Sequence, residues 1–134
     1  VMIMELKPGM IGTHCMTVRE DMLACAVGSG AIPVLATPWM VAMMEAAAQN
    51  SVAEAIGEGN VTVGTQLNIS HMAATPLGME VRAESELIEV DGRRLVFRVA
   101  AYDACDKIGE GTHERFIVGA ERFVAKCNAK AAQK

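Results

Sequence analysis

The chain has 134 residues, a typical length for one domain that buries about two-thirds of its unfolded surface. Half of the residues are apolar but few are aromatic, so methionine, alanine and valine must fill much of the core. The formal net charge of −4 and the absence of RNA-binding or zinc-finger motifs argue against a nucleic-acid partner, and we expect a single domain over residues 1–134.

Cysteine usage and hydropathy predict a soluble, cytoplasmic protein. The four cysteines form no C-x-x-C pair and no zinc-type spacing with the three histidines, which favours reduced thiols over disulfides or a metal site. The longest apolar stretch, residues 38–48, is much shorter than the roughly 20 residues that a membrane-spanning helix needs. The apolar part of residues 1–10 is too short for a signal peptide. We expect no membrane partner, metal or bound cofactor.

The first part of the chain predicts one strand and a loop. β-branched residues recur through residues 9–21, which is typical of a strand. Residues 22–34 are interrupted by Gly28, Gly30 and Pro33, so we expect a loop with a short helical turn.

A long helix after this loop is the strongest local signal. Thr37 is a favourable N-cap residue, Pro38 suits the first turn, and Gly57 and Gly59 supply a stop. The residues between are good helix formers and extend for about five turns. Because the first half of this helix is apolar around most of its circumference, we expect it to be wrapped on several sides.

The rest of the chain alternates as antiparallel strands. The predicted strands have the ranges 60–72, 78–90, 93–104 and 109–125. The first carries four aliphatic residues on one face, namely Val61, Val63, Leu67 and Ile69, and Asp91-Gly92 predicts a hairpin between the next two. The tail, residues 126–134, is expected to be frayed. These elements predict an α+β fold in which an antiparallel sheet is wrapped around one long central helix.

Glu45 is the only ionisable side chain between Pro38 and Ala48, in a segment that otherwise resembles a protein core. Burial of an unpaired carboxylate is costly. One interpretation is structural: Glu45 caps another element or pairs with a basic residue such as Arg115. The other is catalytic: the carboxylate is held in a pocket as a base or a nucleophile. We favour the catalytic interpretation.

Thr37 is predicted to lie at the mouth of the helix, where N–H groups and a hydroxyl can converge on an anion or a polarised carbonyl. An ordinary N-cap is the alternative role. Thr37 and Glu45 are about 12 Å apart along a helix, too far for both to act on one small reacting centre. Shared chemistry would require two antiparallel helices related by a two-fold axis, so we expect a homodimer, with a tetramer left open.

Histidines and a glycine complete the set of candidates. His71 ends a predicted strand, where a lone histidine is more often a surface residue, and it becomes a catalytic candidate if it meets Glu45. His113 is expected to be structural, and Arg115 to be a charge partner at the site. Gly64 is a mid-strand glycine, which is typical of a place where a backbone or a ligand approaches closely.

This pattern resembles the hot dog fold thioesterases and, among them, the fluoroacetyl-CoA thioesterase family. The matching segments extend over most of the chain, and the more specific ones are HMAATP at 71–76 and GTHER at 111–115. The resemblance implies a hot dog fold, a dimer that hydrolyses acyl-CoA, and catalytic roles for Thr37, Glu45 and His71. It also places Gly64 near the thioester carbonyl, and we group Arg115 with it as substrate-binding. Whether Glu45 attacks the carbonyl or activates water stays open.

The chain departs from this family in the loop before the long helix. The family places phenylalanines there as a lid over the substrate, whereas residues 27–37 offer glycine and alanine. We therefore expect hydrolysis of a short or small acyl-CoA thioester without strict selectivity for the fluorinated acyl group. Two alternatives stay open: a hot dog hydratase or dehydratase, and a non-catalytic acyl-CoA-binding protein. Acyl dehydratases tend to carry a histidine just before the glutamate helix, and none lies between His14 and Thr37.

Overall fold

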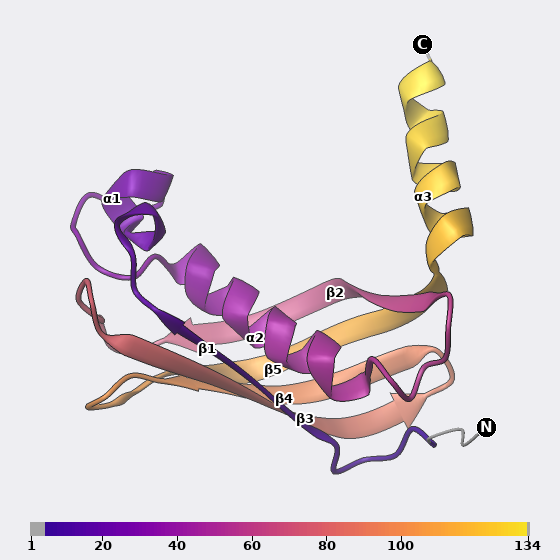
Figure 1. The fold of residues 1–134 in the computed structure, drawn as a ribbon, viewed down its shortest axis with the longest axis horizontal. Helices are drawn as coiled ribbons and strands as arrows, with labels where there is room; N and C mark the ends of the chain where they lie inside the picture. Colours follow the sequence, from indigo (N-terminus) through magenta and orange to yellow (C-terminus); the bar gives the residue numbers. More distant parts are fainter. Residues whose placement is uncertain (1–4, 134) are drawn as a thin grey trace.

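An antiparallel sheet curves around one long helix in the computed structural model, which describes residues 5–133 (Figure 1). Within this part of the chain the elements are, in order, β1 (Ile11–Thr17), η1 (Glu20–Met22), α1 (Ala24–Val27), α2 (Thr37–Val52), β2 (Asn60–His71), β3 (Glu80–Asp91), β4 (Arg94–Tyr102), β5 (Lys107–Gly119), α3 (Ala120–Asn128) and η2 (Ala129–Ala132). The strand order is β1-β3-β4-β5-β2, and every neighbouring pair is antiparallel. The predicted α+β architecture is confirmed.

The loop and the hairpin agree with their predictions in outline. Residues 22–34 form a loop that contains the short helix α1. The β3–β4 hairpin is present, but its two-residue loop is Gly92-Arg93, because Asp91 pairs with Arg94 across the ladder. Gly92 has a φ of +61°, which glycine adopts readily at the start of such a turn. The predicted turn was therefore one residue too early.

Helix α2 begins at Thr37, but Thr37 is not its N-cap. The N-cap residue is Ala36, and no side chain caps the helix. The N-cap prediction for Thr37 is therefore wrong, because the extended residue before the first helical turn is Ala36, with φ −70° and ψ 139°. At the other end α2 stops at Val52, and a turn over residues 53–56 leads to Gly57, whose φ is +88°.

One face of α2 supplies much of the core. Its buried residues are apolar and mostly methionine or alanine: Met40, Met43, Met44, Ala47, Ala48 and Val52. They share one hydrophobic cluster with Leu87 of β3 and Phe97 of β4. On β1, a Cβ added to Gly12 would lie 2.0 Å from the carbonyl oxygen of Ala47, so glycine permits α2 to sit directly on the strand.

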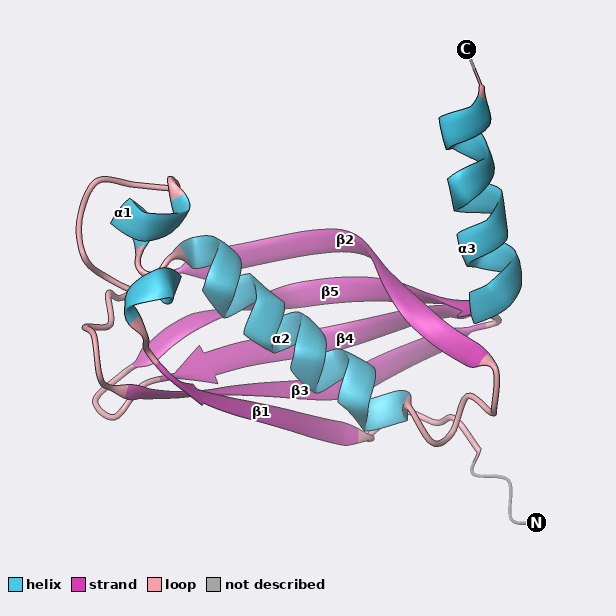
Figure 2. Cartoon of the chain, turned by 45° about the horizontal axis from the view of Figure 1, so that its top comes forward, coloured by secondary structure: helices cyan, strands magenta, loops and turns pink. Residues whose placement is uncertain are grey.

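The other face of α2 is open, contrary to the expectation that the helix is wrapped on several sides. Pro38 and Ala42 are exposed. The neighbouring strand β2 forms an edge of the sheet and exposes 41% of Val61 and 45% of Leu67, whereas Thr62 is buried. Figure 2 shows α2 lying across the sheet with β2 along its border. An apolar helix face and a strand edge are thus uncovered in the described chain.

The last strand ends earlier than predicted. β5 stops at Gly119; helix α3 replaces the expected strand through residue 125, and the end of α3 followed by η2 replaces the expected frayed tail. Gly119 pairs with Asn60, the first residue of β2, so no neighbouring strand on that side continues to pair beyond this point. Residues 120–128 are mostly good helix formers, and α3 projects away from the sheet (Figure 2).

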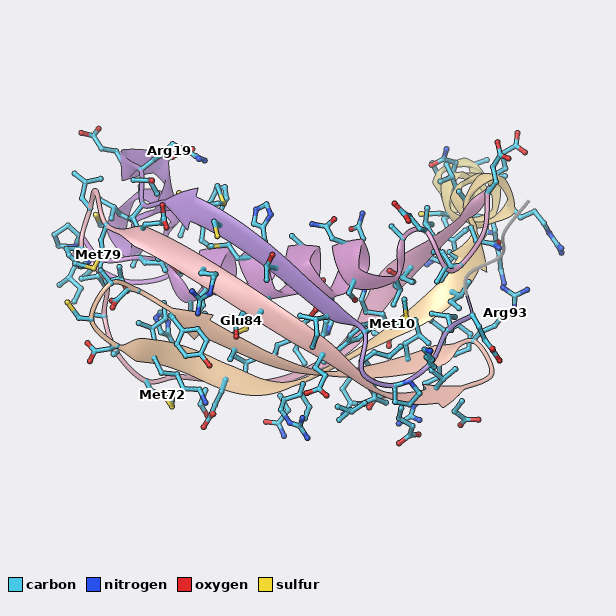
Figure 3. The ribbon with its side chains drawn as sticks, turned by 60° about the horizontal axis from the view of Figure 1, so that its bottom comes forward. Met10, Arg19, Met72, Met79, Glu84 and Arg93 are labelled. Carbon is cyan, nitrogen blue, oxygen red and sulfur yellow. The ribbon has the colours of Figure 1, made fainter. Side chains whose placement is uncertain are left out.

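The sheet face away from α2 is polar. It carries Glu84, labelled in Figure 3, and the ion pair of Arg98 with Glu86, whose nitrogen and oxygen atoms are 3.0 Å apart. Helices among residues 5–133 are all too short or too polar to cross a membrane.

Candidate active site

Thr37 and His71 are hydrogen-bonded to each other. Thr37 is the first residue of α2 and His71 is the last residue of β2, and the fold brings these two ends together. The distance from Thr37 Oγ1 to His71 Nδ1 is 2.7 Å. The hydroxyl is available for this bond because it does not cap the helix. Two predicted catalytic residues, 34 positions apart in sequence, thus form one pair within a single chain.

His71 is in a state that suits proton transfer. Burial lowers its pKa from the ordinary value of 6.5, and the backbone of Ala73 opposes this shift to a smaller extent. The imidazole is therefore neutral at neutral pH, and its Nδ1 can accept the proton of the Thr37 hydroxyl. Its Nε2 is buried and has no hydrogen-bond partner among the described residues. The pair has the geometry of a hydroxyl nucleophile beside its general base.

A cavity of about 260 Å³ adjoins this pair. Its lining is made of small or apolar residues besides the pair itself: Ala24, Ser29, Val34, Leu35, Met72, Ala73 and Ala74. A larger cavity, about 600 Å³, is lined by strand residues such as Glu86 and Arg98 and contains none of the predicted site residues. The smaller cavity is therefore the better candidate for a reacting group.

Glu45 lies two turns further along α2 and belongs to a second cluster. Its side chain is 38% exposed, and its Oε2 is 3.4 Å from Nη1 of Arg115. The pairing with Arg115 that the structural interpretation of Glu45 named is therefore present, and the catalytic interpretation stays a prediction. A Cβ added to Gly64 would lie 2.7 Å from Glu45 Oε2, so the glycine leaves the space that the carboxylate occupies. Gly64 borders a bulge in β2, where the register with β5 shifts between Gly64 and Gln66.

Arg115 is buried, and protein groups surround its guanidinium. Its Nε donates to Thr62 Oγ1 at 2.8 Å and its Nη2 donates to the Thr62 carbonyl oxygen at 2.8 Å. Its Nη1 lies 3.1 Å from His113 Nε2, in addition to its contact with Glu45. Burial is the largest influence on this side chain and lowers its pKa, while Glu45 raises it. Because arginine has a very high ordinary pKa, the guanidinium stays charged.

The structure therefore separates the predicted residues into two clusters. Thr37 and His71 form one, and Glu45, Gly64 and Arg115 form the other. Within one chain the described contacts do not join Glu45 to His71, so the expected meeting of these two residues does not occur there.

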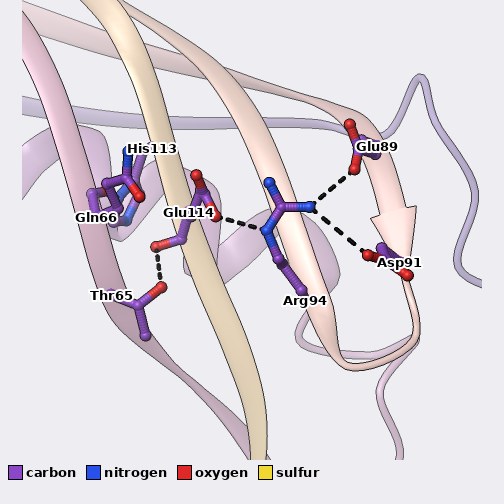
Figure 4. A network of polar contacts seen from close by, with 7 residues as sticks. All are labelled: Thr65, Gln66, Glu89, Asp91, Arg94, His113 and Glu114. Carbon is purple, nitrogen blue, oxygen red and sulfur yellow. Dashed lines mark hydrogen bonds and ion pairs between the residues drawn. The ribbon is translucent and has the colours of Figure 1, made fainter.

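Besides Thr62, the sequence analysis left one further residue unconnected to the second cluster, namely His113. It is fully buried, and Figure 4 shows it beside Gln66, whose carbonyl oxygen is 2.9 Å from His113 Nδ1. His113 and Arg115 are two residues apart on β5, so their side chains share a face. That spacing is the signal that could have found the contact.

The same part of β5 is fixed from its other face. Thr65, at the β2 bulge, donates to the Glu114 carbonyl oxygen at 3.2 Å. Arg94 donates to the Glu114 carboxylate at 2.7 Å and pairs with Glu89 and Asp91 (Figure 4). The residue between His113 and Arg115 is thus tied to both neighbouring strands, which holds this stretch of β5 in place.

Comparison with known proteins relates this arrangement to one family. The family model described as fluoroacetyl-CoA-specific thioesterase matches residues 18–121. A fluoroacetyl-CoA thioesterase from Streptantibioticus cattleyicolor is 45% identical over 97 residues, which cover 72% of this chain and 70% of that protein.

Solved structures are similar over nearly the whole chain. A mutant fluoroacetyl-CoA thioesterase in complex with acetyl-CoA has a TM-score of 0.88 and 35% identity, covering 93% of this chain and 98% of that one. A Thermus thermophilus member of the thioesterase superfamily has a TM-score of 0.85 and 27% identity, covering 96% and 97%. These similarities confirm the predicted hot dog fold.

Proposed function

Because this chain belongs to the fluoroacetyl-CoA-specific thioesterase family, and is therefore a thioester hydrolase, we propose that it cleaves a small acyl-CoA at a site shared by two copies. The observation that carries this proposal is the Thr37–His71 hydrogen bond beside a cavity lined by small and apolar residues. The products are the free acid and CoA, and the chemistry needs no metal or cofactor. We also propose that the protein acts in the cytoplasm, where CoA thioesters are formed and used.

The second copy would bring Glu45 to the Thr37–His71 pair. If two α2 helices pack antiparallel, Thr37 of one lies opposite Glu45 of the other when the two-fold axis passes near residue 41, midway between them. If two β2 edges pair antiparallel, Gly64 of one approaches His71 of the other when the axis passes between residues 67 and 68. The exposed Leu67 and the open face of α2 support this arrangement, because both would be covered.

In this arrangement the thioester carbonyl faces the N–H groups at the start of α2 and the backbone of Gly64. Thr37 Oγ1 attacks the carbonyl carbon while His71 takes its proton, and the proton then passes to the departing CoA sulfur. Glu45 of the second copy activates water for hydrolysis of the acyl group. In the competing route Glu45 itself attacks and forms an acyl anhydride, and Thr37 only orients the carbonyl.

Isotope labelling separates these routes. After a single turnover in oxygen-18 water, the anhydride route places label in the Glu45 carboxylate, because water can attack either carbonyl of the anhydride. Label in the Glu45 carboxylate would establish the anhydride route, whereas label found only in the released acid would mean that water attacks the carbonyl carbon of the substrate's acyl group.

The substrate we propose is a short acyl-CoA with loose selectivity. The loop before α2 contributes Ser29, Val34 and Leu35 to the cavity, with no aromatic side chain. Because no aromatic ring from this loop fills the cavity, it leaves room for acyl groups larger than a two-carbon unit. The CoA thioesters of branched, halogenated and unsubstituted short acids should therefore all be hydrolysed, with kcat values that differ only modestly.

A thiol-release screen across acyl-CoA lengths tests the function. We expect thiol release by the wild type, and a loss of at least about 100-fold in kcat for Thr37→Ala or Glu45→Gln, with Thr37→Ser retaining part of the activity. Addition of water to crotonyl-CoA without thiol release would instead indicate a hydratase. Equal background hydrolysis in wild type and both variants, with acyl-CoA binding intact, would indicate a binding protein.

A further inference from the structure

We propose that His113 and Thr62 are positioning residues: together they hold the Arg115 guanidinium so that its Nη1 fixes the Glu45 carboxylate. This inference rests on the proposed function of Glu45 in hydrolysis. Neither residue reaches Glu45 by a hydrogen bond, so both act through Arg115.

The contacts of the guanidinium leave it little freedom. Thr62 accepts from Nε through its hydroxyl oxygen and from Nη2 through its carbonyl oxygen, each at 2.8 Å. His113 Nε2 lies 3.1 Å from Nη1. These three acceptors are uncharged, and a buried cation without a counter-charge is costly. Glu45 is the carboxylate in contact with Arg115, so the braced guanidinium draws Glu45 Oε2 to one place beside Gly64.

The contact with Arg115 gives the two oxygens of the Glu45 carboxylate different roles. Oε2 is directed to Arg115, whereas Oε1 makes no hydrogen bond to the described residues. Oε1 is thus left for a water molecule or a thioester carbonyl. If the guanidinium turned away, Oε2 would lose its anchor and the carboxylate would be free to rotate about its side-chain torsions.

The contacts of His113 determine its tautomer. A guanidinium nitrogen can only donate, so His113 Nε2 must accept and carry no proton. The Gln66 carbonyl oxygen can only accept, so Nδ1 must carry the proton and donate at 2.9 Å. A second proton, on Nε2, would point at the N–H of Arg115 and break the brace.

The surroundings of His113 keep it in this neutral form. Burial is the largest cause and lowers its pKa, and the charge of Arg115 lowers it further. The Gln66 carbonyl and the carboxylates of Glu45 and Glu114 oppose this, and the Phe97 ring packs nearby at a centroid distance of 6.3 Å. The brace should therefore persist at pH values below the ordinary 6.5 of histidine.

Matched substitutions test the brace by kinetics. Thr62→Val removes the hydroxyl acceptor at nearly constant shape, and Thr62→Ser restores it; His113→Leu removes the ring acceptor, and His113→Gln keeps an acceptor oxygen. We expect Thr62→Val and His113→Leu to lower kcat at least about tenfold with KM within about threefold, and the Ser and Gln variants to recover most of it. His14→Leu, on the far edge strand β1, should leave kcat unchanged.

Folding is checked by circular dichroism, and folded Thr62→Val and His113→Leu variants with wild-type kcat would overturn the proposal. A nitrogen-15 NMR measurement on the wild-type histidines tests it without any activity. We expect the His113 proton on Nδ1, and no second protonation near pH 6.5. A proton on Nε2, or titration at 6.5, would also overturn it. Absence of thiol release by the wild type would overturn the proposed function, whereas the His113 tautomer tests the contact with Arg115 independently of activity.

Discussion

The position of the Glu45 carboxylate requires a glycine at residue 64. Gly64 lies in the middle of β2, where glycine usually weakens a strand, yet any side chain there would start within 2.7 Å of Glu45 Oε2. His113 Cε1 and Arg115 Nη1 follow at 3.2 and 3.5 Å. Because Gly64 has no side chain, the side chains of Glu45, His113 and Arg115 can meet next to β2.

Gly64→Ala should therefore displace the carboxylate rather than unfold the protein. The flexible end of Glu45 can move aside, so we expect a melting temperature close to that of the wild type. Because a misplaced catalytic group costs rate, kcat for thiol release should fall at least about tenfold. Gly92→Ala, in the exposed β3–β4 turn, is the control, since its backbone needs glycine but it touches no site residue. A Gly64→Ala protein with wild-type kcat would show that Glu45 need not occupy this place.

At the scale of elements, α2 packs against the sheet with only one face, and β2 pairs with a neighbouring strand along only one edge among the described residues. α2 buries its methionine face against the sheet and leaves Pro38 and Ala42 exposed. β2 pairs with β5 on one edge, and its other edge makes no ladder among the described residues. Exposed strand edges and apolar faces of this kind are where chains associate. The open face of α2 and the free edge of β2 are both adjacent to the Thr37–His71 pair and to the cluster around Glu45, which the proposed mechanism brings together.

Val41→Lys tests that association at the proposed two-fold axis. Two lysines at residue 41 would face each other across the axis, and we expect the dimer dissociation constant to rise at least about 100-fold. Analytical ultracentrifugation measures this, and kcat should fall with the dimer because Glu45 and Thr37 then act apart. Ile11→Lys is the control: it is 62% exposed on β1, the opposite edge of the sheet. A monomeric Val41→Lys protein with full activity would contradict a shared site.

For the molecule as a whole, the buried His113 and the half-buried His71 link stability to pH. Burial lowers the pKa of His71 and of His113 from 6.5 in the folded chain, whereas the unfolded chain keeps the ordinary value. The unfolded state therefore binds more protons below pH 6.5. The stability that these residues contribute is present above 6.5 and is lost as the pH falls below it, by at most about 1.4 kcal/mol per pH unit for His113 and by less for the half-buried His71, which solvent screens.

Urea unfolding at pH 7.5 and pH 5.5 measures this dependence. We expect the free energy of unfolding of the wild type to decrease toward pH 5.5, and the decrease to be smaller in His113→Gln, which has one titrating group fewer. An identical pH dependence in wild type and His113→Gln would mean that protonation of His113 does not change the free energy of unfolding.

Local patterns along the chain were sufficient for much of the fold and for the list of candidate residues. The period of the apolar residues predicted β2 to β4 to within two residues at each end, and helix formers between Pro38 and Gly57 predicted α2. These elements depend on side-chain alternation and backbone preference, which are properties of short segments. Glu45 and Gly64 could be recognised in the same way, because a carboxylate in an apolar helix and a glycine in the middle of a strand both depart from the local pattern.

Tertiary structure decided what those residues contact. The end of β2 reaches the start of α2, so the Thr37 hydroxyl bonds to His71 instead of capping the helix. The pairing of β2 with β5 places Thr62 and His113 around Arg115, and Arg115 against Glu45. The β2 ladder also ends the last strand at Gly119, where local propensity then favours α3. Each of these outcomes joins residues far apart in sequence, and hydrogen bonds of that kind leave no trace in local periodicity.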